Sequence, residues 1–281
     1  MTRKIIVTDI DGTLLNSSKE ISSKTLQALI RWQEEGNLLV LASGRPSSGM
    51  FKYAKDLRMD EFGGLLISSN GACVVDVKTQ EILWERPMSH SDAKALLDHL
   101  ENFDVIPMIS IDDRMYVNDV FNNNISFMNQ SINIIQYESR GGGYKLSELD
   151  HLKDALTASL YKVLVAGDPQ YLIDNREALS KPFEKTLTSM FTAPFYFEFT
   201  DKGVDKAKAL EFVLDTYNLK DEHTLAFGDG ENDISLLKRC NHAIAMSNAV
   251  DSLKEVSTYV SLSHDEDGIA HALDRYYSNT L

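Results

Sequence analysis

Two aspartates one residue apart follow a short apolar run near the N-terminus. Residues 9–13 read Asp-Ile-Asp-Gly-Thr and come directly after Ile5-Ile6-Val7. An Asp-Gly pair between apolar runs is typical of a β-hairpin turn, because both residues tolerate positive φ. If the apolar run is instead the first strand of a parallel sheet, Asp9 and Asp11 lie at its carboxyl end, where open α/β sheets bind ligands. Side chains two apart on a strand share a face, so both carboxylates can then approach one site.

Two further polar stretches follow apolar runs in the same way. Ser43-Gly44-Arg45 comes after residues 38–42, and a hydroxyl, a glycine and N–H groups at a helix start form an anion site. The simpler interpretation is that Ser43 ends a strand or caps a helix. Residues 228–233 (Gly-Asp-Gly-Glu-Asn-Asp) carry three acidic side chains in five positions, which is typical of a cation site with oxygen ligands. An EF-hand loop is excluded, because Ile234 stands where such a loop requires glycine.

Three lysines lie close together in the sequence before the acidic stretch. Lys202, Lys206 and Lys208 lie at the opening of a predicted helix that has Asp205 as a plausible N-cap. The spacing alone does not choose among the three lysines.

A site that gathers Asp9, Asp11, Asp229 and Asp233 requires a cation. Like charges ~4 Å apart repel by about 4 kcal/mol at an effective dielectric constant of 20. Mg²⁺ is the expected ion, since it favours carboxylates, water and phosphate oxygens. A divalent cation, a lysine and a helix N-terminus around a carboxylate describe phosphoryl transfer to an aspartate.

The elements that would position these residues alternate between strand and helix at both ends of the chain. Apolar runs separated by helices predict parallel strands buried on both faces. We therefore expect an α/β fold with a doubly wound, mainly parallel, Rossmann-like sheet. The expected strands are 4–10, 38–42, 65–67, 224–227 and 243–246, and the expected helices are 22–35, 205–217 and those beginning near 46, 232 and 267.

The middle third of the chain has a different pattern and reads as a separate α+β unit. We assign residues 1–83 and 197–281 to one discontinuous domain and residues 84–196 to a domain inserted in it. The expected elements after residue 70 are a hairpin (73–77 and 81–84), a helix (92–100), strand-like pieces (104–118), a polar stretch (118–133), a triple glycine (141–143), a strand (161–166), a helix (170–180) and strands (187–199).

Bulk composition excludes several classes of function. The net charge of -14 argues against nucleic acid and anionic membrane surfaces as partners. No stretch approaches the ~18 apolar residues of a membrane span, and the N-terminal apolar run is short for a signal peptide. Cys73 and Cys240 suit neither a disulfide framework nor a zinc site. We expect a cytoplasmic protein that binds a small phosphate compound with the help of a cation; the oligomeric state is not encoded in these patterns.

Taken together, the motifs resemble those of the haloacid dehalogenase superfamily. Asp-x-Asp-Gly-Thr, Ser-Gly-Arg, a lysine at a helix start and Gly-Asp-x-x-Asn-Asp look like the four motifs of that family, in order. Further stretches narrow the resemblance to Cof-type phosphatases, and the matches run from residue 5 to about residue 273 with almost none in the middle third. These stretches are 69–72 (Ser-Asn-Gly-Ala), 202–206 (Lys-Gly-Val-Asp-Lys), 245–249 (Ala-Met-Ser-Asn-Ala) and 266–270 (Glu-Asp-Gly-Ile-Ala).

The resemblance implies a phosphatase mechanism and a role for each matched residue. Asp9 would be the nucleophile that forms an aspartyl-phosphate, and Asp11 would be the general acid and then the base. The implied Mg²⁺ ligands are Asp9, Asp229 and the backbone carbonyl of Asp11, with Asp233 orienting the metal shell. The implied phosphate-binding residues are Ile10, Ser43, Gly44, Lys206 and Asn232, and Lys206 would also screen Asp9.

Departures from the family pattern are small. Asp205 stands where the family usually has serine, and Ser247 replaces the usual glycine. The family also implies that residues 84–196 form a mobile cap that closes over the core and supplies substrate contacts. Arg140, beside the triple glycine, is either such a contact or part of a plain surface loop.

The expected substrate is a small phosphomonoester, such as a sugar phosphate or a related metabolite. Three other functions can be weighed against the motifs. One is a catalytically silent phosphate-binding protein, although every proposed catalytic position is filled. A phosphosugar mutase uses a similar aspartate pair but returns the phosphoryl group to sugar. A receiver-like signalling domain has an acidic Mg²⁺ pocket, a Ser/Thr and a Lys, although the aspartate pair on the first strand and the long insertion argue against it.

Overall fold

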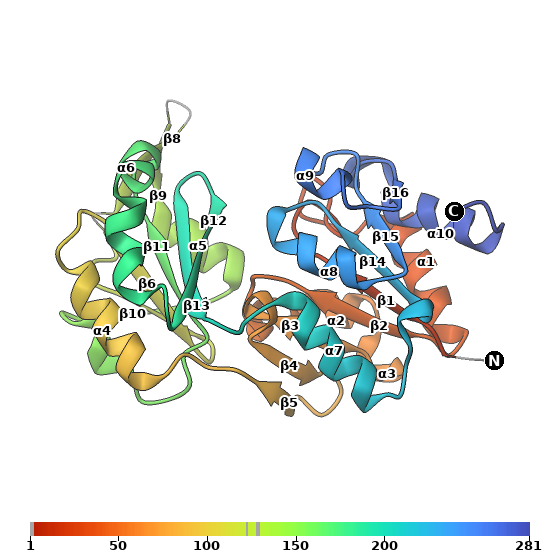
Figure 1. The fold of residues 1–281 in the computed structure, drawn as a ribbon, viewed down its shortest axis with the longest axis horizontal. Coiled ribbons are helices and arrows are strands. Elements are labelled where there is room, and N and C mark those ends of the chain that lie inside the picture. The colour runs from red at the N-terminus through yellow and green to blue at the C-terminus, as the bar shows by residue number, and fades with distance from the viewer. Residues whose placement is uncertain (1–2, 122, 128–129) are drawn as a thin grey trace. The chain divides into compact units, whose positions relative to one another are not determined.

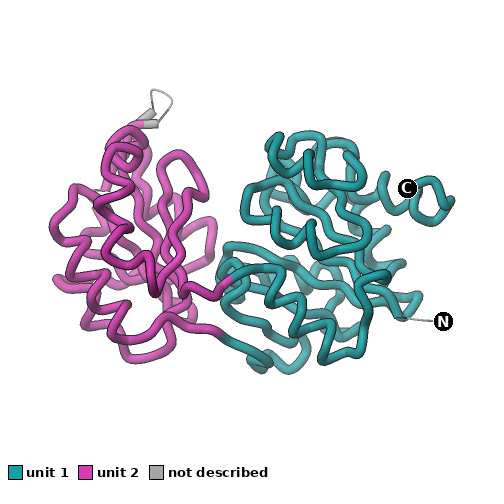
Figure 2. The backbone as a smooth tube through the Cα atoms, viewed as in Figure 1, with its two compact units in different colours: residues 1–85, 205–281 teal, residues 86–204 magenta. Residues whose placement is uncertain are grey.

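The chain folds into two compact units. The computed structural model describes residues 3–121, 123–127 and 130–281. Residues 1–85 and 205–281 form the core unit, and residues 86–204 form the inserted unit (Figure 2). The second boundary therefore falls at 204 rather than at the expected 196. The reason is that strand β13 (Tyr196–Asp201) pairs with β11 (Lys162–Ala166) and β12 (Leu187–Ala193) of the inserted unit.

An eight-stranded sheet organises the core unit, in the order β16-β15-β14-β1-β2-β3-β4-β5 (Figure 1). The pairs from β16 to β3 are parallel, whereas β4 and β5 continue the sheet as an antiparallel hairpin. The predicted doubly wound, mainly parallel α/β sheet is confirmed. The strands are β1 (Ile5–Thr8), β2 (Leu38–Ala42), β3 (Leu65–Ser68), β4 (Cys73–Asp76), β5 (Ile82–Glu85), β14 (Thr224–Gly228), β15 (His242–Ala245) and β16 (Tyr259–Val260).

Helices cover both faces of this sheet, which explains why its strands are apolar without alternation. On one face, Ile5 and Val7 of β1 pack in a cluster with Leu210 and Val213 of α7. On the other face, α1 packs against α10, and the buried Trp32 of α1 donates from Nε1 to a backbone carbonyl of β2 at 2.9 Å. The core helices are α1 (Ser23–Glu34), α2 (Phe51–Asp56), α3 (Met59–Phe62), α7 (Lys206–Thr216), α8 (Ile234–Arg239), α9 (Asp251–Lys254) and α10 (Gly268–Tyr277).

The inserted unit contains a six-stranded sheet in the order β10-β7-β6-β11-β13-β12 (Figure 1). Its pairs are antiparallel except β10 with β7, and the predicted polar stretch at 118–133 contributes a separate hairpin, β8 with β9. Part of that stretch (122 and 128–129) lies outside the described residues. The other elements are α4 (His90–Leu100), β6 (Ile106–Ile111), β7 (Arg114–Val117), β8 (Asn124–Phe127), β9 (Gln130–Asn133), α5 (Ile134–Gly142), β10 (Lys145–Glu148) and α6 (Pro169–Ser180).

The two faces of the inserted sheet are covered differently. Side chains of α4 and α6 pack with Val163 and Val165 on one face. On the other face, Ile134 and Ile135 of α5 pack with Met108 and Leu164. Helix α5 therefore covers the part of this second face that carries apolar side chains.

The triple glycine lies at the end of α5 and not in a free loop. Gly141 and Gly142 are the last residues of the helix, and Gly143 has a φ of 68° and donates its N–H to the Ser139 carbonyl. This left-handed C-terminal cap is a common use of glycine. Arg140 therefore belongs to the last helical turn, which corrects the surface-loop expectation. Across the described residues, no helix is long and apolar enough to span a membrane.

Candidate active site

The carboxyl ends of the parallel strands bring the predicted motifs to one edge of the core sheet. Thr8, the last residue of β1, is in register with Phe227 of β14 on one side and Leu41 of β2 on the other. Asp9, Ser43 and Asp229 therefore follow neighbouring strands at the same edge. The hairpin interpretation of residues 9–13 is wrong, because both strands next to β1 are parallel to it.

Lys206 is the lysine that reaches the acidic groups. Its Nζ lies 2.7 Å from Asp9 Oδ1 and 2.6 Å from Asp233 Oδ1, and its side chain has no exposed surface. Asp205 caps α7 as predicted, since its side chain accepts a hydrogen bond from the Ala207 N–H. Lys206 is the first residue of that helix, so the cap fixes the point at which the lysine enters the site.

The other two lysines lie elsewhere. Lys202 Nζ donates to the Glu184 carbonyl within the inserted unit, and the Lys208 side chain is exposed. The structure therefore makes the choice among the three lysines that spacing could not make.

Asp233 organises the loop after β14. Its Oδ2 accepts from the backbone N–H groups of Asp229 at 3.0 Å and Gly230 at 3.1 Å, while Oδ1 accepts from Lys206. A Cβ on Gly228 would lie 2.6 Å from the Cβ of Asp233, so glycine is required for this close approach. Asp233 thus fixes both the acidic loop and the lysine.

The oxygen atoms of Asp9, Asp229 and Asp233 are close enough to hold a metal ion together. One ligand atom from each lies within 4.8 Å of the others. Both oxygens of Asp233 already accept hydrogen bonds, so Asp233 is the least available of the three as a direct ligand. Asp229 is itself held by Thr13, whose Oγ1 donates to Oδ1 at 2.7 Å. The donor set is all carboxylate oxygen, which suits Mg²⁺.

Without a cation these carboxylates are costly to ionise. Burial raises the pKa of Asp9 well above its usual value, and the charges of Asp233 and Asp229 add to this, while Lys206 opposes it. Burial also raises the pKa of Asp229 to about 6. For Lys206, burial alone would lower the pKa, but Asp233 and Asp9 outweigh it and the pKa is raised. The lysine therefore stays protonated, and the remaining negative charge favours a bound cation.

Gly12 allows the chain to pass directly beside Asp229. Its φ is +81°, and a Cβ at this position would lie 2.3 Å from Asp229 Oδ2. Any side chain at position 12 would therefore both strain the backbone and displace a proposed metal ligand.

The carboxylate of Asp11 does not join the carboxylate cluster. Arg45 binds it with two hydrogen bonds, from Nε to Oδ2 at 2.6 Å and from Nη2 to Oδ1 at 2.8 Å, and Lys19 Nζ lies 3.1 Å from Oδ1. Burial acts to raise the pKa of Asp11, but Arg45 and Lys19 together outweigh it and the pKa is lowered.

The expectation that both carboxylates share one face therefore needs correction. Strand β1 ends at Thr8, so the two-residue period of a strand no longer applies at Asp11.

The residues predicted to bind phosphate line the neighbouring strand ends. Ser43 is buried, and its Oγ accepts a hydrogen bond from the Arg45 N–H at 3.2 Å. Asn232 donates from its side-chain amide to Asn70 Oδ1 at 3.0 Å, and Gly44 lies against the same asparagine.

The helix expected to begin near residue 46 is displaced. A short 3₁₀ turn (Ser47–Gly49) comes first and α2 begins only at Phe51, so Ser43 is not at a helix N-terminus.

The sequence interpretation gave no role to several residues of the site, among them Thr13, Arg45 and Asn70. The sequence could have indicated a role for each of them, because each lies within or next to a motif that follows a strand. Asn70 is the second residue after β3 and has a φ of 58°, a left-handed conformation that asparagine tolerates better than most residues. What the motifs do not contain is the identity of the partner: Asp229 for Thr13, Asp11 for Arg45 and Asn232 for Asn70.

The fold and the site together define an α/β enzyme with a buried carboxylate–lysine centre. Comparisons identify the family. The family model of haloacid dehalogenase-like hydrolases matches residues 6–273. A Bacillus subtilis protein named as a 5-amino-6-(5-phospho-D-ribitylamino)uracil phosphatase is 27% identical over 288 residues, which cover 98% of this chain and 97% of that protein.

Comparison with solved structures leads to the same family. A haloacid dehalogenase-like hydrolase from Bacteroides thetaiotaomicron is 31% identical with a TM-score of 0.89, covering 98% of this chain and 100% of that one. A Thermotoga maritima protein is 27% identical with a TM-score of 0.83, and the match covers 98% of this chain and 97% of that one. The chain belongs to the haloacid dehalogenase-like hydrolase family, as the motifs predicted. It is a phosphoric monoester hydrolase of that family.

Proposed function

We propose that the chain is a Mg²⁺-dependent phosphatase that hydrolyses small phosphomonoesters through an aspartyl-phosphate on Asp9. The observation that carries this proposal is the Asp9–Lys206 pair. A nucleophilic carboxylate must be ionised while an anionic phosphate approaches it. Lys206, fully buried and 2.7 Å from Asp9, provides the positive charge that makes this possible.

The first half-reaction transfers the phosphoryl group to the enzyme. An oxygen of Asp9 attacks phosphorus, the bond from phosphorus to the alcohol oxygen breaks, and Asp11 gives a proton to the departing oxygen. In the second half-reaction a water molecule loses a proton to Asp11 and attacks phosphorus. The bond between Asp9 and phosphorus then breaks, which releases phosphate and restores both carboxyl groups.

The metal and the phosphoryl oxygens would occupy the space between the strand ends. Asp9, Asp229 and the backbone carbonyl of Asp11 would hold Mg²⁺, oriented by Asp233. Bound Mg²⁺ would neutralise charge on the phosphoryl group. The phosphoryl oxygens would contact Lys206 and the other predicted groups, namely Ile10, Ser43, Gly44 and Asn232.

The proposed substrate class rests on the name of a relative. The ester hydrolysed by the Bacillus subtilis relative, as its name states, carries phosphate on a ribityl chain. We extend this to the present chain as a phosphomonoester of a hydroxylated metabolite, such as a sugar phosphate. We also keep a cytoplasmic location and a small-molecule partner, with neither nucleic acid nor membrane, as parts of the proposal.

Turnover of p-nitrophenyl phosphate tests the proposal. We expect Mg²⁺-dependent release of phosphate that is lost on chelation and in Asp9→Asn, because the amide cannot act as the nucleophile. Asp60→Asn, an exposed aspartate of α3, is the matched control and should retain full activity. Robust turnover by Asp9→Asn would overturn the assignment of the nucleophile.

The same assay with a sugar phosphate as the substrate separates the alternatives. A phosphosugar mutase would return the phosphoryl group to sugar, so quantitative release of phosphate from a sugar phosphate excludes it. A receiver-like protein would accumulate a long-lived aspartyl-phosphate without turnover.

A further inference from the structure

Two motifs of the core unit, residues 245–249 and 266–270, supply none of the residues of the proposed chemistry. The first motif spans the end of β15 and the loop after it. The second spans the end of a 3₁₀ turn (His264–Glu266) and the start of α10. The loop after β15 and the 3₁₀ turn both contact residues 12–19, the part of the chain that follows Asp11. We call residues 12–19 the turn segment.

Asn248, in the first motif, joins the turn segment to the 3₁₀ turn. Its Nδ2 donates to the Gly12 carbonyl at 2.9 Å, and its Oδ1 accepts from the His264 N–H at 3.1 Å. An asparagine amide offers both a donor and an acceptor, so one side chain makes both bonds. In the reverse orientation its oxygen would face the Gly12 carbonyl, so the two partners fix the orientation of the amide.

The loop that carries Asn248 also contacts the acidic loop after β14. The Val250 N–H donates to the Asp229 carbonyl at 3.0 Å. Gly12 is the residue that passes directly beside the Asp229 carboxylate, and Thr13 donates to the same carboxylate at 2.7 Å. The Asn248 loop therefore contacts both of the strand ends that supply the proposed metal ligands.

Asp265, in the 3₁₀ turn, holds the other end of the turn segment. Its Oδ1 accepts from the Ser17 N–H at 2.7 Å, and its Oδ2 accepts from Ser17 Oγ at 2.6 Å. The hydrogen bonds from the hydroxyl and the N–H of Ser17 lower the pKa of Asp265, so the carboxylate form is the one that holds Ser17. Ser17 Oγ also lies 3.3 Å from His264 Nε2.

The turn segment carries a second group that faces the proposed site. Lys19 Nζ lies 3.1 Å from Asp11 Oδ1. Lys19 has a φ of 61°, which is uncommon for a residue with a side chain, and its N–H donates to the Asn16 carbonyl at 2.9 Å. Ser17 lies inside this tight turn, so its bonds to Asp265 anchor the turn that presents Lys19 to Asp11.

The second motif builds the 3₁₀ turn. Glu266 Oε2 accepts from Oγ of Ser263 at 2.7 Å and from its N–H at 3.3 Å. The Gly268 N–H donates to the Ser263 carbonyl at 3.1 Å. A Cβ on Gly268 would lie 2.2 Å from the Leu262 carbonyl oxygen, so glycine is required where the chain closes the turn. The turn is therefore fixed by its own bonds.

We propose that Asn248 and the 3₁₀ turn form a clamp that fixes both ends of the turn segment and so positions the proposed metal site. Asn248 acts through Gly12 and Asp265 acts through Ser17, so both are positioning residues and not metal ligands. The inference rests on the proposed function, because the site that is positioned is the proposed Mg²⁺ site. A segment already fixed in the metal-free protein has less backbone freedom to lose when the ion binds.

Calorimetric titration with Mg²⁺ measures the effect of the clamp without catalysis. Removal of a residue that orients metal ligands typically costs about 10- to 100-fold in metal affinity. We expect Asn248→Ala to raise the Kd for Mg²⁺ about tenfold. Asn241→Ala is the matched control, because Asn241 is an exposed asparagine of the core unit whose amide also donates to a backbone carbonyl. Its Kd should equal that of the wild type.

The other end of the clamp is tested with two substitutions of one residue. Asp265→Ala should raise the Kd for Mg²⁺ about fivefold, but it also removes a negative charge, which by itself weakens cation binding. Asp265→Asn removes the same charge and keeps an oxygen for the Ser17 N–H and an amide that donates to the Ser17 hydroxyl. Its Kd should stay within about twofold of the wild type. An equal loss in the two variants would assign the effect to charge and overturn the clamp.

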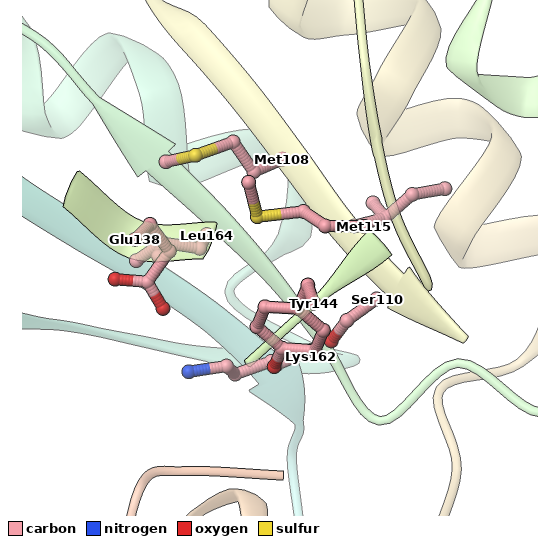
Figure 3. Close-up of a pocket in the computed structure, with 8 residues that line it drawn as sticks. Met108, Ser110, Met115, Glu138, Tyr144, Lys162 and Leu164 are labelled. Atoms are coloured by element: carbon pink, nitrogen blue, oxygen red, sulfur yellow. The ribbon is translucent and has the colours of Figure 1, made fainter. Parts of the chain in front are cut away.

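A serine substitution tests the same contact without a change of charge. Ser17→Ala removes one of the two bonds to Asp265 and should raise the Kd for Mg²⁺ about threefold. Ser110→Ala is the control, because Ser110 lines a small cavity of the inserted unit with Tyr144 and Lys162 (Figure 3). The inserted unit holds none of the proposed metal ligands, so this Kd should equal that of the wild type. Equal increases in the two serine variants would overturn the role of Ser17.

The two ends of the clamp are also tested together. Asn248, Ser17 and Asp265 are exposed, so their substitutions remove no core packing. If the loss of one anchor already frees the turn segment, the loss of the second adds little. Asn248→Ala combined with Asp265→Ala should therefore raise the Kd about tenfold. Independent effects would multiply to about fiftyfold, and that result would overturn the clamp.

Failure of the clamp and failure of the proposed function give different results. A wild-type protein that binds Mg²⁺, with the expected losses in the variants, yet releases no phosphate from any ester would refute the proposed function alone. Unchanged Mg²⁺ binding in Asn248→Ala would refute the clamp alone. Absence of Mg²⁺ binding in the wild type would refute the clamp together with the metal dependence of the proposed function.

Discussion

At the scale of single residues, the second aspartate of the motif is held by an arginine. Both oxygens of Asp11 accept hydrogen bonds from Arg45, and the guanidinium also lies over the ring of Tyr53 at 5.5 Å. A carboxylate engaged in this way has no proton to give to a leaving group. Arg45 thus sets the resting position of the proposed general acid, and Asp11 must leave this contact and take up a proton from water before it can protonate the leaving oxygen.

This arrangement predicts that substitution of Arg45 affects poor leaving groups most. Lysine cannot reproduce the two parallel hydrogen bonds of a guanidinium. In Arg45→Lys we expect kcat for an alkyl phosphate to fall about tenfold or more, since general acid catalysis contributes about 10² or more. The loss should be much smaller for p-nitrophenyl phosphate, whose leaving group needs no proton.

Steady-state kinetics with both esters checks the prediction. Arg58→Lys is the control, because Arg58 makes a similar two-bond pair with Glu61 on the surface. Equal losses for the two esters would show that Arg45 acts on the phosphoryl group and not through Asp11.

The two thiols allow a test of burial at the residue scale. Burial raises the pKa of Cys240 to about 12. The thiolate is the reactive form, so at pH 8 only about one thiol in 10⁴ would be ionised in the native protein. In a Cys73→Ser background, iodoacetamide should modify native Cys240 at least a hundredfold more slowly than the urea-unfolded protein. Equal rates at pH 8 would contradict the buried position.

At the scale of elements, the N-cap of α7 links helix stability to the site. The Asp205 side chain satisfies the Ala207 N–H, and the next residue after the cap is Lys206. We expect Asp205→Ala to lower the free energy of unfolding by about 1 kcal/mol, whereas Asp205→Ser should be nearly neutral because serine caps helices as well. Urea denaturation measures the free energy of unfolding of both variants.

A second capped helix gives the control for this prediction. Asp168 caps α6 in the inserted unit, and its side chain accepts from the N–H groups of Gln170 and Tyr171. Asp168→Ala should cost a similar amount of stability without changing KM for p-nitrophenyl phosphate. If Asp205→Ala leaves KM and kcat unchanged as well, the cap does not position Lys206.

At the scale of the whole molecule, the carboxylates at the sheet edge couple metal binding to stability. Asp9 and Asp229 are buried or half-buried, and burial raises the pKa of both. Their repulsion opposes folding in the metal-free protein, and an ion that binds only the folded state relieves it.

We therefore expect Mg²⁺ to raise the melting temperature. At about 100 times its dissociation constant the ion would add roughly 2.7 kcal/mol, which is several degrees for a chain of this size. Differential scanning calorimetry at matched ionic strength measures the shift, which should be lost in Asp229→Asn. Asp251→Asn is the control, because the Asp251 side chain is fully exposed, and this variant should keep the shift in melting temperature. A shift of equal size in both variants would refute the site.

The sequence by itself determined the fold class and the motifs. Unbroken apolar runs such as residues 38–42 are buried on both faces, which only a covered parallel sheet provides, and parallel strands place whatever follows them at one edge. Asp9, Ser43 and Asp229 could therefore be predicted to lie together. Local patterns also identified the Asp205 cap, because its geometry depends on residues within one turn.

Only the tertiary structure decided which side chains meet. The choice of Lys206 over Lys202 and Lys208 depends on the direction in which α7 leaves its cap. The pairing of Asp11 with Arg45 joins residues 34 positions apart, and no local pattern records such a distance. The boundary at residue 204 likewise follows from the pairing of β13 with β11. Backbone propensity and burial are local properties that a sequence shows directly, whereas ion pairs and strand partners are set by packing between distant segments.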